Sequence, residues 1–190
     1  MKDILLIGGG GHCKSVIDTI ETEGKFNIVG IVEKYPGESK EVLGYPLIGS
    51  DDDLAELRKN YSYAIITVGH IQSNAIRLKL YKKLKELDFT LPTIISPLAY
   101  VSKHAKVQEG TVVLHHALIN AHAQVGKNCI INSKALVEHD AIIQNHVHIS
   151  TNATINGATL VKEHSFVGSG ATTKESATVE GFIKAGSLVK

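Results

Sequence analysis

Residues 101–172 read, in groups of six, VSKHAK VQEGTV VLHHAL INAHAQ VGKNCI INSKAL VEHDAI IQNHVH ISTNAT INGATL VKEHSF VGSGAT. Every group begins with Val or Ile, and Thr173, Val179 and Ala185 continue the series more weakly. The fifth member of each group is small or modest in size: Ala105, Thr111, Ala117, Ala123, Cys129, Ala135, Ala141, Val147, Ala153, Thr159, Ser165, Ala171 and, in the next group, Ala177. A helix repeats every 3.6 residues and a strand every two, so a period of six fits neither as one continuous element.

A period of six fits short strands laid along the three sides of a coil, with one aliphatic side chain per side pointing inward. Three groups then make one coil, so residues 18 apart in the sequence stack directly, and the fifteen groups predict five coils. The pattern therefore predicts a parallel β-helix over residues 98–190. The period alone does not set the handedness of this β-helix. Crossovers between parallel strands are usually right-handed, so a left-handed β-helix would depart from that rule.

Residues 1–92 follow different periods. Short apolar runs at 4–7, 28–32 and 64–68 predict strands, and helical spacing predicts helices at 13–23, after Ser50 through Leu54 and Leu57, and around Ile76, Leu80 and Leu84. This alternation predicts a small Rossmann-like domain with a doubly wound parallel sheet. Pro92 and Pro97 bracket a predicted junction at residues 91–97, before the coils begin.

Composition excludes several classes of protein. The 20 Lys and Arg nearly balance the 19 Asp and Glu, so the net charge gives no reason to expect nucleic acid as a partner. The two cysteines, Cys13 and Cys129, cannot build a disulfide framework and fit a reducing compartment. No stretch approaches the roughly 20 apolar residues of a membrane span. We therefore expect a cytoplasmic protein.

A glycine-rich turn, Gly8–Gly11 followed by His12, lies between the first predicted strand and helix. Bare backbone N–H groups at a helix N-terminus can bind phosphate, and glycines allow close approach. The dinucleotide fingerprint wants Gly or Ala where Cys13 stands, although Glu33 ends the second strand as a ribose-binding acid would. Two interpretations stay open: the turn binds the phosphate of a nucleotide or nucleotide sugar, or it only shapes a tight turn.

The histidines of the repeats form two groups. Those three residues after the aliphatic position indicate a solvated corner: His104, His116, His122, His146 and His164. His139 differs because it stands between Glu138 and Asp140, and a neighbouring carboxylate makes an imidazole a better general base. The alternative is an ordinary surface histidine among charges.

A metal centre is a further alternative, since γ-class carbonic anhydrases hold zinc with three histidines on a β-helix. Two of those histidines lie five residues apart, but Gln144 stands five after His139. A zinc site also needs three converging protein ligands, so we expect no metal.

These features together resemble the NeuD/PglD group of bacterial sugar O- and N-acetyltransferases over essentially the whole chain. The resemblance rests on the strand with its Gly-Gly-His turn, the six-residue repeats and the segment Leu136-Val137-Glu138-His139-Asp140. It implies a left-handed β-helix that forms homotrimers, with acetyl-CoA bound between subunits. It also implies the following roles: His139 as catalytic base, Asp140 raising its basicity, His148 and Gly157 at acetyl-CoA, and Gly10, Gly11, His12, Glu33, Lys34 and Gly69 at a nucleotide sugar.

The chain departs from that family in two places. Two acidic residues are usual where Glu33 and Lys34 stand, and a Gly-x-Pro-Ala-Lys-like stretch that helps cover CoA has no counterpart before Lys190. We therefore expect changes in nucleotide recognition and in CoA affinity.

The expected reaction is direct acetyl transfer, with backbone N–H groups of the coils holding the oxyanion. The acceptor is either the amine of a nucleotide-linked amino sugar or a hydroxyl of sialic acid, and residues 148–152 look closer to the sialic-acid branch. A non-catalytic trimer that binds sugar nucleotides is the alternative of a different class.

Overall fold

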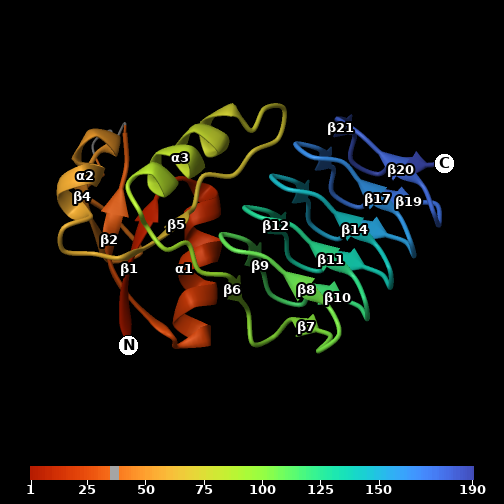
Figure 1. The fold of residues 1–190 in the computed structure, drawn as a ribbon, viewed down its shortest axis with the longest axis horizontal. Helices are drawn as coiled ribbons and strands as arrows, with labels where there is room; N and C mark the ends of the chain where they lie inside the picture. Colours follow the sequence, from red (N-terminus) through yellow and green to blue (C-terminus); the bar gives the residue numbers. More distant parts are fainter. Residues whose placement is uncertain (35–38) are drawn as a thin grey trace. The chain divides into compact units, whose positions relative to one another are not determined.

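The computed structural model describes residues 1–34 and 39–190, and the chain divides into two compact units. One unit comprises Met1–Gly69 and Ala75–Pro92, and the other comprises His70–Asn74 and Thr93–Lys190. Figure 1 shows helices and a sheet in the first unit and a stack of short strands in the second. In the described part of the chain, no helix is long and apolar enough to cross a membrane.

The first unit is built on a five-stranded sheet of order β3-β4-β2-β1-β5. Its strands are β1 (Lys2–Ile7), β2 (Phe26–Val32), β3 (Glu41–Val42), β4 (Tyr45–Gly49) and β5 (Tyr63–Ile66). The inner strand β1 pairs in parallel with β2 and β5, and its last four residues are completely buried. The three predicted strands are therefore present. The hairpin of β3 and β4 was not predicted; β4 extends the parallel sheet and β3 pairs antiparallel at the edge.

The helices of this unit are α1 (Gly11–Glu23), the 3-10 helix η1 (Asp51–Asp53), α2 (Leu54–Leu57) and α3 (Ala75–Glu86). The helix predicted after Ser50 starts with a capping box between Ser50 and Asp53, but it is divided into η1 and one turn of α2. Within α3, Ile76 is 67% exposed and Arg77 is buried instead. The guanidinium of Arg77 donates to the carbonyls of Ile66 and Val68, which explains why a charged residue can replace an apolar one there.

The second unit contains three stacked sheets of two-residue strands, which Figure 1 shows as successive coils from green to blue. The strands are β6 (Ile94–Ile95), β7 (Tyr100–Val101), β8 (Lys106–Val107), β9 (Val112–Val113), β10 (Leu118–Ile119), β11 (Gln124–Val125), β12 (Ile130–Ile131), β13 (Leu136–Val137), β14 (Ile142–Ile143), β15 (His148–Ile149), β16 (Thr154–Ile155), β17 (Leu160–Val161), β18 (Phe166–Val167), β19 (Thr172–Thr173), β20 (Thr178–Val179), β21 (Phe182–Ile183) and β22 (Leu188–Val189). Most neighbouring strands pair in parallel at an offset of 18 residues, as Leu118 with Leu136 does. The predicted stacking register is confirmed.

Two positions of the hexad explain the coil. The aliphatic first residue and the small fifth residue both point inward and form one continuous core, exemplified by Val137 and Ala141, both fully buried. The fourth residue makes the corner with a left-handed backbone: His116, His122, Asn128, Lys134, Asp140, His146, Asn152, Ala158, His164 and Ser176 all have φ between 53° and 67°. Asn, Asp and His tolerate this conformation better than most side chains. The corner prediction is therefore confirmed for four of the five histidines, His104 excepted.

The regular register fails at the C-terminal end of the coils. β21 follows β20 closely and pairs Phe166 with Phe182, so the offset is 16 residues rather than 18. As a result Ile183 packs against the core, and the prediction that Ala185 continues the inward series is wrong. Gly181, at φ 77°, makes the shortened turn. At the N-terminal end the register holds, because β6, within the junction expected at residues 91–97, already pairs Ile94 with Val112 at an offset of 18 residues.

Candidate active site

Residues 138–140 form the corner between β13 and β14. Asp140 takes the left-handed conformation at φ 61°, and the N–H of Ala141 donates to the carbonyl of Glu138 at 3.3 Å. The next coil supports the same corner, since the N–H of Ala158 donates to the carbonyl of His139 at 3.0 Å. The backbone is thus fixed on both sides, while the side chains of His139 and Asp140 remain 59% and 52% exposed.

The two side chains form a hydrogen-bonded pair, with Nδ1 of His139 2.8 Å from Oδ2 of Asp140. This hydrogen bond raises the pKa of His139, and the charges of Asp140, Glu138 and Glu175 add to the effect. The same contact, together with one from His122, lowers the pKa of Asp140. A proton held on Nδ1 by the carboxylate leaves the lone pair of Nε2 open, which is the arrangement of a general base.

Gly157 lies one coil beyond His139 and gives the imidazole its space. A Cβ added at Gly157 would lie 2.9 Å from Cε1 and 3.0 Å from Nε2 of His139, closer than real Cβ atoms approach. Any larger residue would therefore displace the ring. Because these two residues stack at the predicted offset of 18, the size of residue 157 limits where the imidazole of His139 can lie.

The coil before the corner contributes two more contacts. Nδ1 of His122 lies 2.7 Å from Oδ1 of Asp140, so that carboxylate is shared by two imidazoles. Nδ2 of Asn120 donates at 2.7 Å to Oε2 of Glu138, which also accepts the N–H of His139 at 3.1 Å. Sequence reasoning had assigned His122 to the solvated corners. The signal that could have found it was the 18-residue offset from Asp140, the same offset that singled out Gly157.

His148 does not lie beside His139. His148 belongs to β15, on another side of the coil, and is 6% exposed. Nδ1 contacts the carbonyl of His70 at 2.7 Å and Nε2 contacts the amide of Asn132 at 3.2 Å, while the ring packs edge-on against Phe166. Within one chain, His148 therefore has both ring nitrogens engaged.

The glycine-rich turn follows β1 at the carboxyl end of the parallel sheet. Gly10 is the N-cap of α1 and Gly11 is its first residue. The carboxylate of Glu33, at the end of β2, accepts the N–H of Gly9 at 2.6 Å. Nearby, a Cβ at Gly69 would lie 3.4 Å from Cβ of His12, so these two residues are adjacent. The structure thus gathers most of the predicted nucleotide-sugar residues at one edge of the sheet.

Two cavities open at this edge. One, of about 420 Å³, is lined by Gly9, Gly10 and Glu33 together with Lys14. The other, of about 410 Å³, is lined by Gly10, Glu33 and Lys34 together with Lys79 of α3. The sequence did not predict Lys14 or Lys79 as site residues. Helical periodicity does not show that these two side chains line a cavity at the edge of the sheet. Ligands of open α/β sheets bind at the carboxyl ends of the strands.

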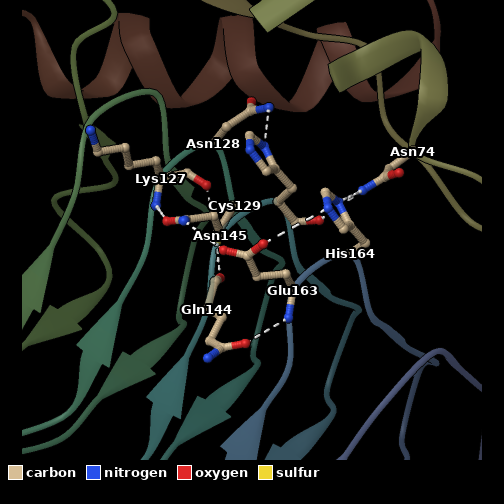
Figure 2. A network of polar contacts seen from close by, with 9 residues as sticks. Asn74, Lys127, Asn128, Cys129, Gln144, Asn145, Glu163 and His164 are labelled. Atoms are coloured by element: carbon tan, nitrogen blue, oxygen red, sulfur yellow. Dashed lines mark hydrogen bonds and ion pairs between the residues drawn. The ribbon is translucent and has the colours of Figure 1, made fainter. Parts of the chain in front are cut away.

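Two further corner histidines, His146 and His164, belong to a network of polar contacts, part of which Figure 2 shows. His164 meets the amide of Asn74 at 2.8 Å, and His146 meets that of Asn128 at 3.0 Å. The two rings stack with centroids 5.4 Å apart. Among residues 1–34 and 39–190, no cluster of three or more His, Cys, Asp or Glu could hold a metal ion.

Comparisons with known proteins identify the fold and the family of the chain. Residues 3–84 match the family model of the PglD N-terminal domain. Perosamine N-acetyltransferase from Caulobacter crescentus, solved as a histidine variant with CoA and GDP-perosamine, is 31% identical with a TM-score of 0.93, covering 100% of this chain and 89% of that one. The acetyltransferase domain of PglB from Neisseria gonorrhoeae, also solved with acetyl coenzyme A, is 30% identical with a TM-score of 0.89; the match covers 100% of this chain and 92% of that chain.

A curated relative, UDP-N-acetylbacillosamine N-acetyltransferase of Bacillus subtilis, is 31% identical over 118 residues, which cover 60% of this chain and 52% of that protein. The aligned segment thus spans about half the length of that relative. The fold and these matches define an acyltransferase of the hexapeptide-repeat class, with the predicted left-handed parallel β-helix. More particularly, the chain belongs to the NeuD/PglD family of bacterial sugar acetyltransferases.

Proposed function

We propose that this chain transfers the acetyl group of acetyl-CoA to the amine of a nucleotide-linked amino sugar, with His139 as general base. The observation that carries the proposal is the His139–Asp140 pair, in which Asp140 engages Nδ1 of an exposed imidazole that lies against Gly157. The relatives support the amine over the hydroxyl of sialic acid as acceptor, because two of them are named as N-acetyltransferases. One of the two was solved with CoA and the nucleotide-linked sugar GDP-perosamine.

In the proposed reaction, Nε2 of His139 accepts a proton from the acceptor amine as the nitrogen attacks the thioester carbonyl. The new C–N bond forms and the C–S bond breaks, so the imidazolium can return the proton to the departing thiolate of CoA. Asp140 keeps its charge throughout and stabilises the imidazolium through Nδ1. No covalent enzyme intermediate is required.

The acceptor's nucleotide is proposed to bind at the carboxyl edge of the sheet in the α/β unit. The N–H groups of Gly10 and Gly11 at the start of α1 suit a diphosphate, and Lys34 adds positive charge. Glu33 holds the loop through Gly9, while His12 and Gly69 form the adjacent wall.

Acetyl-CoA is proposed to lie between subunits of a homotrimer. Gly157 and His148 occupy different sides of the coil, so one chain does not present both to the same thioester. This separation supports a site in which His139 and Gly157 of one subunit face the β15 side of its neighbour. A monomer by light scattering at assay concentration would contradict this arrangement.

The test is His139→Ala, with His104→Ala as the control because His104 is exposed and has no left-handed backbone. Release of CoA is followed with nucleotide-linked amino sugars and separately with sialic acid. We expect kcat to fall by about 10²–10⁴ for His139→Ala, the usual contribution of a positioned base, with little change in KM for acetyl-CoA.

Near-normal turnover of His139→Ala would refute its role. If CoA were released only with sialic acid, the acceptor would be a sialic acid hydroxyl rather than the amine of a nucleotide-linked sugar. Tight binding of nucleotide sugar without any thioester cleavage would favour the non-catalytic trimer.

A further inference from the structure

We infer that His122 is a positioning residue that holds the carboxylate of Asp140 in line with His139. The inference deepens the proposed function and rests on it for its catalytic consequence. Its physical basis is a shared carboxylate: Oδ1 of Asp140 meets Nδ1 of His122 at 2.7 Å, and Oδ2 meets Nδ1 of His139 at 2.8 Å.

Asp140 needs such a partner because little else restrains its side chain. The carboxylate is 52% exposed, and a water-exposed carboxylate with a single hydrogen bond can rotate away from that partner. A second donor on the other oxygen fixes the plane of the carboxylate, and with it the direction of Oδ2. The backbone corner sets the position of Asp140, and His122 sets its orientation.

His122 is supplied by the register of the coils. It lies 18 residues before Asp140, and both corners have a left-handed backbone, at φ 64° and 61°. The Nδ1 atoms of the corner histidines His146 and His164 meet neutral amides instead, and Nε2 of His164 lies 3.9 Å from the carboxylate of Glu163. His122 therefore differs from them in contacting a carboxylate that is itself bonded to the proposed base.

The charges around His139 and Asp140 determine in which direction the pKa of His139 should move when His122 is lost. His139 is faced by Asp140, Glu138 and Glu175, and Asp140 by His122 and His139. His122 contacts Oδ1 and leaves Oδ2 to His139, so the Asp140 carboxylate still raises the pKa of His139. Loss of His122 frees Asp140 to rotate, which weakens its contact with His139 and lowers the pKa of that imidazole.

The test compares His122→Gly with His122→Asn. Glycine removes the donor and suits the left-handed corner. Asparagine also tolerates this corner, and its Nδ2 stands as many bonds from the backbone as Nδ1 of histidine. His116→Gly is the matched control, since His116 is an exposed corner histidine at φ 60° elsewhere on the coil.

We expect His122→Gly to lower kcat by about 3- to 10-fold, the effect of one net hydrogen bond, with KM for acetyl-CoA unchanged. The pKa of His139, measured by NMR titration and assigned with His139→Ala, should move down. His122→Asn should restore both values, and His116→Gly should match the wild type. All variants should melt within a few degrees of one another.

A double-mutant cycle with Asp140→Asn decides whether His122 acts through Asp140. In that background His122→Gly should have no further effect on kcat or on the pKa of His139. Additive effects, an upward pKa shift, or equal losses in the Gly and Asn variants would overturn the inference. The titration needs no substrate, so a failure of the proposed reaction would appear separately, as undiminished turnover of His139→Ala.

Discussion

Gly157→Ala is the most direct perturbation of the proposed base. The backbone of Gly157 is not left-handed, so alanine meets no conformational penalty there. Its Cβ, however, would lie 2.9 Å from Cε1 of His139, whereas ordinary contacts begin at 3.4 Å. The ring must therefore move by about half an ångström, which would weaken its 2.8 Å hydrogen bond to Asp140. Because misplacement of about 1 Å can cost 10²-fold, we expect kcat to fall by about 10-fold or more.

The assay is steady-state release of CoA at saturating acceptor, with kcat and KM for acetyl-CoA determined separately. Thermal melting of Gly157→Ala in the wild-type and His139→Ala backgrounds serves as the control. Without the imidazole the new methyl group has room, so the substitution should no longer affect the melting temperature. Unchanged kcat with a raised KM for acetyl-CoA would refute the reasoning, because Gly157 would then serve only the co-substrate.

Two other substitutions test the remaining parts of the site. Asp140→Asn should lower kcat and shift the acidic limb of the pH profile of kcat/KM to lower pH, because the limb reports the pKa of His139, which Asp140 raises above its ordinary value of 6.5. An unmoved limb would contradict this assignment. Glu33→Gln, measured by titration with nucleotide sugar and with acetyl-CoA, should weaken only nucleotide-sugar binding, since Glu33 holds Gly9 in the α/β unit; equal losses for both would argue against it.

The coils could be predicted because each hexad carries the same physical demand. An inward aliphatic residue and a small residue after the corner are required on every side, so the period survives without any knowledge of tertiary contacts. The prediction failed at Ala185, where Gly181 shortens the turn and shifts the register by two residues. Ile183, four residues after Val179, was the available signal for that shift.

The α/β unit was harder to predict at its edge. The hairpin of β3 and β4 turns at Leu43 and Gly44, both with positive φ. Leucine is an unusual residue for a left-handed position, so the usual Asn-Gly or Asp-Gly signal of such turns is absent. The burial of Arg77 was equally hard to predict from the sequence. It depends on the carbonyls of Ile66 and Val68, at and just after the end of β5, which only the folded sheet brings within reach.

The site itself illustrates how a requirement of the fold and a requirement of the chemistry can meet in one residue. A corner of the coil needs a residue that accepts a left-handed backbone, and Asp, Asn and His are among the few that do. At Asp140 this structural choice also places a carboxylate beside the exposed imidazole of His139. The 18-residue register then adds His122 below and Gly157 above. A largely exposed pair can therefore be ordered without burial, because successive coils, rather than a hydrophobic pocket, restrain each side chain.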